Sequence, residues 1–161
     1  MLLIGVGSTN ILLACGDKFL VSSRSTRYQK PAVARTPSAI LIWANPASEL
    51  SKGLAGVAVD DTLRKVGYRP TTVATASEFD QALNRGGWDL VIVGAADAQA
   101  VSERLRSAGS PAVVPVALNP TTAQFQQVKK EYAVVLKAPA KRQSFLDAVD
   151  EALARRSKKI A

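Results

Sequence analysis

The chain has 161 residues, of which 47% are hydrophobic and 21% charged, a composition that suits one packed domain with short flanking segments. It contains no histidine and one cysteine, which excludes His-based catalytic triads, phosphohistidine relays, intrachain disulfides and four-cysteine metal clusters. Its formal charge of +8 raises the question of nucleic acid or an anionic membrane as a partner.

The positive charge lies near the two ends of the chain. Residues 15–37 carry five Lys or Arg and one Asp, and residues 155–161 carry four Lys or Arg and no acidic residue. Residues 38–154 carry equal numbers of basic and acidic side chains. Because a DNA-reading domain carries its charge excess on its folded face, we expect no specific nucleic-acid partner.

Residues 1–14 are uncharged and mostly apolar. They are too few for a transmembrane helix but about as long as the apolar region of a signal peptide. The tetrad Leu12-Leu13-Ala14-Cys15 resembles the lipobox of bacterial lipoproteins. That resemblance implies cleavage before Cys15, lipid attachment at its thiol, and a location on a bacterial membrane outside the cytoplasm.

The segment 15–37 is rich in Ser, Arg and Thr without a sustained period, which predicts a flexible basic tether beside the lipid headgroups. The leader carries no Lys or Arg, whereas a signal peptide begins with a basic region. The alternative is that residues 1–14 form a buried strand, that Cys15 is a core thiol, and that the protein is cytoplasmic.

From residue 38 onward, apolar runs alternate with stretches of helical spacing. The apolar runs predict strands at residues 39–44, 71–75, 88–93, 112–118 and 133–137. The helical spacing predicts helices at residues 47–66, 77–85, 96–107, 121–131 and 143–156, followed by a basic tail at 157–161.

Five apolar strands separated by helices predict an α/β fold with a parallel sheet covered on both faces. The flavodoxin-like strand order 2-1-3-4-5 suits a domain at residues 38–156, and ligands of that fold bind beyond the carboxyl ends of the strands. Pro115 lacks a backbone donor, so we expect its strand to lie near an edge or to be bulged.

Three segments of this domain resemble the receiver domain of bacterial two-component response regulators. They are Ile40-Leu41-Ile42-Trp43, Trp88-Asp89-Leu90-Val91-Ile92-Val93 and Val135-Leu136-Lys137-Ala138-Pro139, which match the first, third and fifth strands of that family. The resemblance implies the fold. In the family, the proline bond after the fifth strand is often cis, although X–Pro statistics alone favour trans.

The resemblance also implies where a phosphorylation pocket would lie, and the residues there are degenerate. Ala44 and Asn45 stand in place of the metal-binding acidic pair, Gly94 in place of the acceptor aspartate, and Ala117 in place of the phosphoryl-binding hydroxyl residue. The family has a lysine directly before the proline, whereas here Ala138 separates Lys137 from Pro139. Asp97, near the acceptor loop, is expected to belong to a helix. We therefore expect no metal, no cofactor and no enzymatic activity.

The sequence thus predicts a phosphorylation-independent pseudo-receiver that binds an unknown protein partner. The resemblance places the docking face at the last strands and helices, including Phe125, Tyr132 and residues 143–156. Two alternatives stay open. One is a soluble cytoplasmic regulatory domain, and the other is a small-ligand-binding domain that uses Asn45, Asn119 and Thr121.

Overall fold

The computed structural model of the chain describes residues 37–48, 50–106 and 111–160. The predicted leader, Cys15 and residues 15–36 of the predicted tether lie outside the described residues.

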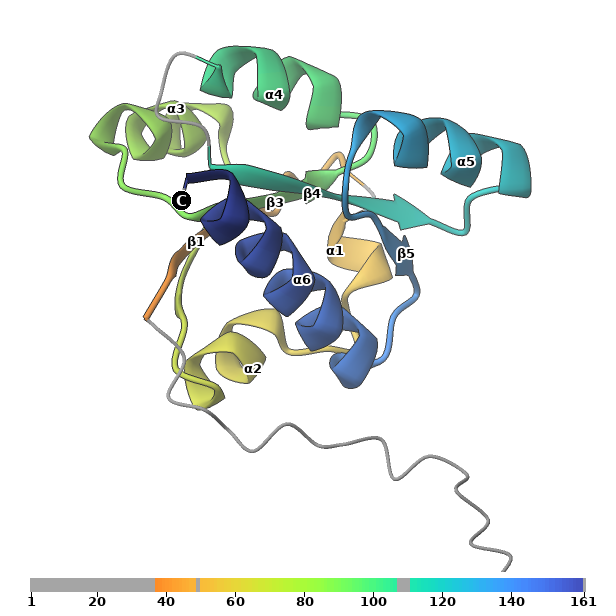
Figure 1. Cartoon of the computed structure of the whole chain (residues 1–161), viewed down its shortest axis with the longest axis horizontal. Helices are drawn as coiled ribbons and strands as arrows, with labels where there is room; N and C mark the ends of the chain where they lie inside the picture. Colours follow the sequence, from red (N-terminus) through yellow and green to blue (C-terminus); the bar gives the residue numbers. More distant parts are fainter. Residues whose placement is uncertain (1–36, 49, 107–110, 161) are drawn as a thin grey trace, which may run out of the picture. The chain divides into compact units, whose positions relative to one another are not determined.

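The described residues form a five-stranded parallel sheet with helices between the strands (Figure 1). The strands are β1 (Ala39–Trp43), β2 (Arg69–Val73), β3 (Leu90–Gly94), β4 (Ala112–Leu118) and β5 (Leu136–Ala138). The helices are α1 (Leu50–Gly53), α2 (Val59–Lys65), α3 (Ala76–Arg85), α4 (Ala98–Leu105), α5 (Thr122–Glu131) and α6 (Arg142–Ile160). The strand order β2-β1-β3-β4-β5 confirms the predicted α/β class and order.

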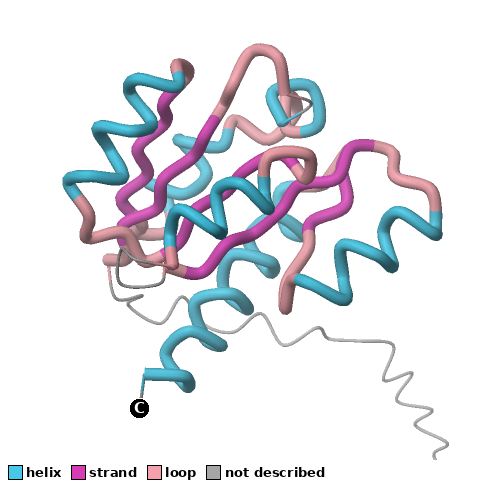
Figure 2. Tube along the Cα trace, turned by 90° about the horizontal axis from the view of Figure 1, so that it is seen from above, coloured by secondary structure: helices cyan, strands magenta, loops and turns pink. Residues whose placement is uncertain are grey.

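Side chains alternate between two cores along the central strands, because successive residues of a strand point to opposite faces. Ile40 and Ile42 pack into the core beneath α1, α2 and α6, whereas Leu41 packs into the core beneath α3 and α4. The tube view in Figure 2 shows helices on both sides of the sheet. Burial on both faces explains why the strands read as continuous apolar runs.

The predicted helix at residues 47–66 is wrong, because this segment forms two short helices. Ala58, which precedes α2, adopts a left-handed backbone conformation with φ of 38°. Gly53 and Gly56 weaken helix formation before that point. Gly53 also lies close to β5, since a Cβ added there would be 2.8 Å from the Cβ of Ala138.

The strand β5 is shorter than the predicted strand at residues 133–137. Pro115 on β4 explains why β5 begins only at Leu136. The backbone N–H of Ala112 donates to Asp89 beside β3, and that of Asn119 donates to Ala138 of β5. Odd-numbered residues of β4 therefore direct their backbone groups toward β5. At Pro115 this edge lacks a donor, and β5 pairs only from Val116 onward.

The last helix is longer than predicted. α6 continues to Ile160 and so includes residues 157–160, which we expected as a basic tail. Its inner face carries Phe145 and Val149, which are completely or almost completely buried. The basic residues Lys158 and Lys159 thus belong to the last turn of a helix, where they complement the helix dipole.

The two glycines around α1 give a matched test of packing. We expect Gly53→Ala to lower the free energy of unfolding by about 1–3 kcal/mol, because the new methyl group overlaps Ala138. Gly56→Ala is the control, since a Cβ there meets no atom within 4 Å, and it should be neutral or stabilising by up to about 1 kcal/mol. Urea unfolding followed by circular dichroism measures both, and equal effects would contradict the close approach of α1 to β5.

Candidate functional site

The residues of the predicted pocket gather at the carboxyl edge of the sheet. Ala44 follows β1, Gly94 ends β3, Ala117 lies near the end of β4, and Pro139 follows β5. Parallel strands place these positions on one edge. The registers agree, since Gly94 pairs with Val116, the neighbour of Ala117.

The loop after β1 is fixed by its own hydrogen bonds. The Asn45 side-chain oxygen accepts a bond from the backbone N–H of Ala47 at 3.0 Å. The Asn45 carbonyl accepts from both the backbone N–H and the hydroxyl of Ser48, at 2.9 and 2.8 Å. Asn45 therefore uses its oxygens to shape a turn that carries Ser48 toward β3.

Two other side chains border the space next to Gly94. A Cβ added to Gly94 would lie 3.4 Å from the Cβ of Ser48 and 3.6 Å from Oδ2 of Asp97. Gly94 itself is buried at the end of β3. A side chain at position 94, such as the acceptor aspartate of the receiver family, would therefore begin in van der Waals contact with Ser48 and Asp97.

Asp97 places a carboxylate in this region from the start of α4. Its backbone N–H donates to the carbonyl of Gly94 at 3.0 Å, and its side chain makes no capping bond to the helix. The positive end of α4 favours a carboxylate there. Within the ranges that the structure describes, no three Asp, Glu, Cys or His side chains come together as a metal-binding group.

The remaining pocket positions lie on β4, β5 and the turn that follows. Ala117 is 5% exposed and offers no hydroxyl group. On β5, Lys137 is exposed between the buried Leu136 and Ala138, so its ammonium lies on the opposite face from those two residues. The peptide bond between Ala138 and Pro139 is cis, as it often is in the receiver family.

A neutral cavity of about 520 Å³ lies beside Ala117, between the end of β4 and α5. Of the three residues predicted to hold a small ligand, Asn119 lines this cavity. Thr121 instead caps α5, where its hydroxyl accepts from the N–H of Gln124 and Gln124 Oε1 accepts in return from the Thr121 N–H. Asn45 is committed to its own loop, so the structure does not bring the three together.

One carboxylate with a shifted pKa lies at the start of α3. Backbone N–H groups of Ala74 and Thr75 donate to Glu78 and hold its pKa below the usual value. Glu78 forms a capping box with Thr75. Its carboxylate therefore stabilises the helix terminus, and we assign it no role in the pocket.

Solved structures that resemble this chain include two receiver domains. One is a signal receiver domain of a modulated diguanylate cyclase from Desulfovibrio desulfuricans G20, described as an example of alternate folding. It has a TM-score of 0.56 at 15% sequence identity, and the aligned part covers 77% of this chain and 99% of that domain. A CheY-like response regulator receiver domain from Methanospirillum hungatei JF-1 has a TM-score of 0.51 at 12% identity and covers 76% and 96%. The fold is receiver-like.

The third structure with this receiver-like fold is a putative pilus assembly-related protein from Burkholderia pseudomallei K96243. It has a TM-score of 0.52 at 20% identity and covers 73% of this chain and 90% of its own. No family model and no curated protein sequence matches the chain. The likeness therefore establishes the fold alone.

Sequence reasoning missed the role of Ser48. Its position five residues after the end of β1 carries no recognisable motif, and only the turn built on Asn45 brings it to Gly94. The spacing alone predicts that Asp97 lies near the acceptor loop. The contact between its carboxylate and the Cβ position of Gly94 depends on the loop geometry.

Replacing Gly94 tests how much room Ser48 and Asp97 leave for a side chain at this position. We expect Gly94→Asp to lower the free energy of unfolding by about 2–4 kcal/mol, because a second carboxylate would be desolvated beside Asp97. Gly94→Asn has nearly the same volume without the charge and should cost less. Thermal and urea unfolding compare the two variants, and a Gly94→Asp protein as stable as the parent would show that the space is open.

Proposed function

We propose that residues 38–156 form a receiver-like interaction module that works without phosphoryl transfer. The observation that carries this proposal is Gly94 at the acceptor position, with Ser48 and Asp97 in van der Waals contact with the place where its Cβ would lie. Phosphoryl transfer depends on a positioned metal ion and acceptor. Here Ala44 and Asn45 replace the acidic pair, and the Asn45 oxygens are committed to the loop. The module then acts through its surface, as a signalling domain that binds a protein partner and has no enzymatic activity.

The partner face that we favour is formed by α5, β5 and the outer side of α6. α5 buries none of its side chains, so it adds little to either core. Phe125 is half-buried, and the Lys129 ammonium lies 5.2 Å from its ring centroid. Tyr132 is also half-buried, and its hydroxyl accepts a bond from Ser102. These aromatic groups are available to a partner at modest cost in stability.

We further propose that the module is held on a bacterial membrane, outside the cytoplasm, by a lipid on Cys15. The apolar leader, the lipobox-like tetrad ending at Cys15 and the basic segment 15–37 support this placement. In the described part of the chain, no helix has the length and apolar character needed to span a bilayer. A cytoplasmic location is the competing possibility.

A phosphoryl donor separates this module from an active receiver. We expect no stoichiometric adduct when the purified protein is incubated with Mg²⁺ and acetyl phosphate, or with a beryllofluoride analogue, because the acceptor position is Gly94. Intact-protein mass spectrometry and fluorine NMR detect the two adducts. An active receiver domain in the same reaction is the positive control, and stoichiometric labelling of this chain would overturn the proposal.

Substitution of Cys15 tests the membrane anchor. In a bacterial host that processes lipoproteins, we expect the parent chain in the membrane fraction and Cys15→Ser in the soluble fraction, because the serine hydroxyl cannot form the thioether to the lipid. Fractionation followed by mass spectrometry reports cleavage and acylation together. An unmodified full-length parent chain in the cytosol would instead support the cytoplasmic alternative.

A further inference from the structure

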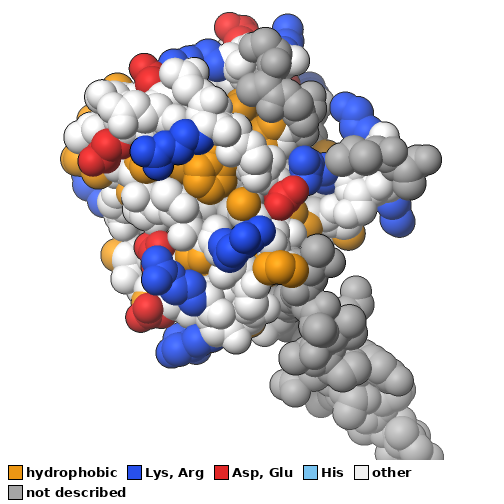
Figure 3. All heavy atoms as spheres, turned by 90° about the vertical axis from the view of Figure 1, so that its left-hand side faces the viewer, with side chains coloured by type: hydrophobic (Ala, Val, Ile, Leu, Met, Phe, Trp, Pro, Cys, Tyr) orange, Lys and Arg blue, Asp and Glu red, His pale blue; other side chains and the backbone are white. Residues whose placement is uncertain are grey.

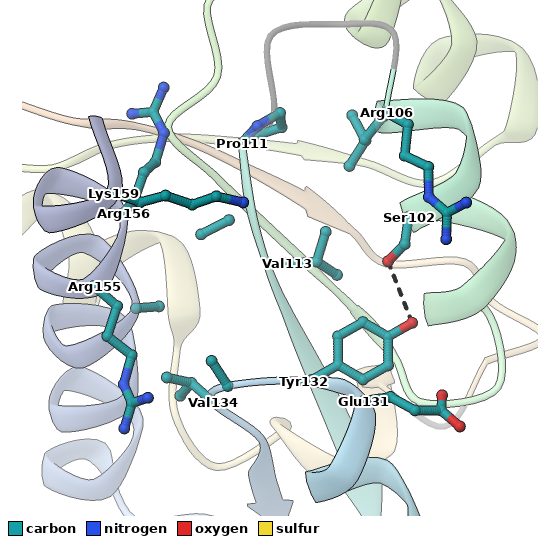
Figure 4. A pocket seen from close by; sticks show the side chains of 14 residues that line it. Ser102, Arg106, Pro111, Val113, Glu131, Tyr132, Val134, Arg155, Arg156 and Lys159 are labelled. Atoms are coloured by element: carbon teal, nitrogen blue, oxygen red, sulfur yellow. Dashed lines mark hydrogen bonds between the residues drawn. The ribbon is translucent and has the colours of Figure 1, made fainter. Parts of the chain in front are cut away.

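A second cavity lies at the opposite edge of the sheet, where the strands begin. It measures about 340 Å³ and lies between the carboxyl-terminal ends of α4 and α6 and the chain that follows α5 (Figure 4). Ala112 and Val113 of β4, Val134 and the half-buried Tyr132 contribute apolar surface. We call it the amino-edge cavity. It shares no lining residue with the vacated pocket around Gly94.

An incomplete strand pairing opens this cavity. Val113 and Val134 both line it, but the ladder between β4 and β5 begins only at Val116 and Leu136. Odd-numbered residues of β4 direct their backbone groups to this side, so the N–H and C=O of Val113 face the cavity. Among the described residues, no strand pairs with β4 at Val113 on this side. The N–H and C=O of Val113 that are left open here can pair with the backbone of another extended chain.

Four basic side chains line the amino-edge cavity. Arg155, Arg156 and Lys159 come from α6, and Arg106 comes from the end of α4, as Figure 4 shows. Glu131 is the one acidic residue in the lining. The space-filling view of this side of the molecule shows Lys and Arg side chains interspersed with Asp, Glu and apolar side chains (Figure 3).

Two of these cations are engaged within the protein and two are not. Arg156 forms an ion pair with Asp89, and Arg155 pairs with Glu151 one turn earlier on α6 at 2.7 Å. Arg106 and Lys159 are exposed and make no ion pair with any described residue. The Nε of Arg156 is buried and lacks a hydrogen-bond partner among the described residues. The cavity thus keeps positive charge that its own carboxylates do not neutralise.

We propose that the amino-edge cavity binds an extended acidic segment of a partner protein, which pairs with β4 at Val113 and places carboxylates against Arg106 and Lys159. The open edge of β4 favours an extended peptide over a compact anion. Charge complementarity identifies its acidic character and argues against the chain's own segment 15–37, which carries five basic residues and one acidic residue. This inference rests on the proposed interaction role and adds the chemistry of one partner.

Selection from a random heptapeptide display library against the full-length protein tests the peptide chemistry. We expect enriched peptides in which acidic residues alternate with apolar ones, because alternate side chains of an added strand face the same way. Binding of an enriched peptide should slow hydrogen exchange at the Val113 amide. Failure to enrich peptides, enrichment of basic or neutral peptides, or unchanged exchange at Val113 would overturn the proposal.

Matched charge reversals test the location. In the double variant Arg106→Glu and Lys159→Glu, we expect the enriched peptide to bind about tenfold more weakly or worse. The control is Lys65→Glu with Arg85→Glu, which reverses one Lys and one Arg in the last turns of α2 and α3, neither of which lines the cavity. The control should bind within about twofold of the parent. Equal losses in both double variants would overturn the proposed location.

A small anion is the competing occupant. Inorganic phosphate and ATP are added separately to the parent protein and to the cavity double variant, and the melting temperature is measured. A shift seen only in the parent, with no acidic peptide enriched, would assign the cavity to a small anion and overturn the peptide proposal. No phosphoryl donor is needed for these measurements, so their failure leaves the proposed independence from phosphorylation standing.

Discussion

Burial of the parallel sheet on both faces is the constraint on which the two candidate sites depend. Ile40 and Leu41 are both completely buried although they point to opposite faces, so helices must cover each side. Parallel strands with helical crossovers then collect the carboxyl ends of the strands at one edge and the carboxyl ends of the helices at the other. The carboxyl edge receives the loops that carry Ser48 and Asp97. The amino edge receives the ends of α4 and α6, with their terminal Arg and Lys residues.

At the carboxyl edge, the loop after β1 lies against the end of β3. Ser48 is in ordinary van der Waals contact with the place where a side chain on Gly94 would begin. A metal site would require several carboxylates kept close together, which repel one another without the cation. Here one carboxylate, Asp97, lies at the positive end of α4.

The sequence predicted the strand order and the composition of the carboxyl edge because both follow from apolar runs and their ends. It failed where tertiary structure overrides local pattern. Leu50 and Leu54 have helical spacing, but Leu63, nine residues after Leu54, would lie on the opposite side of one continuous helix. All three are buried because the left-handed backbone at Ala58 divides the segment. The short β5 depends on Pro115 of a neighbouring strand, so the run at 133–137 alone could not reveal it. Ser48 shows the same limit, since its role depends on a hydrogen-bonded turn.

The basic residues at the amino edge have an ordinary explanation that accounts for only part of what is observed. Cations near helix carboxyl termini complement the partial negative charge there, and this explanation covers Lys65 and Arg85 at the ends of α2 and α3 as well as Lys159. It does not explain why Arg106 and Lys159, from different helices, border one cavity against an unpaired stretch of β4. A helix end carries about half an elementary charge, so each full cation leaves a positive surplus. A solvated helix terminus does not require open backbone groups beside such a positive surplus. An acidic extended chain would neutralise the surplus with its carboxylates and pair with the open N–H and C=O of β4.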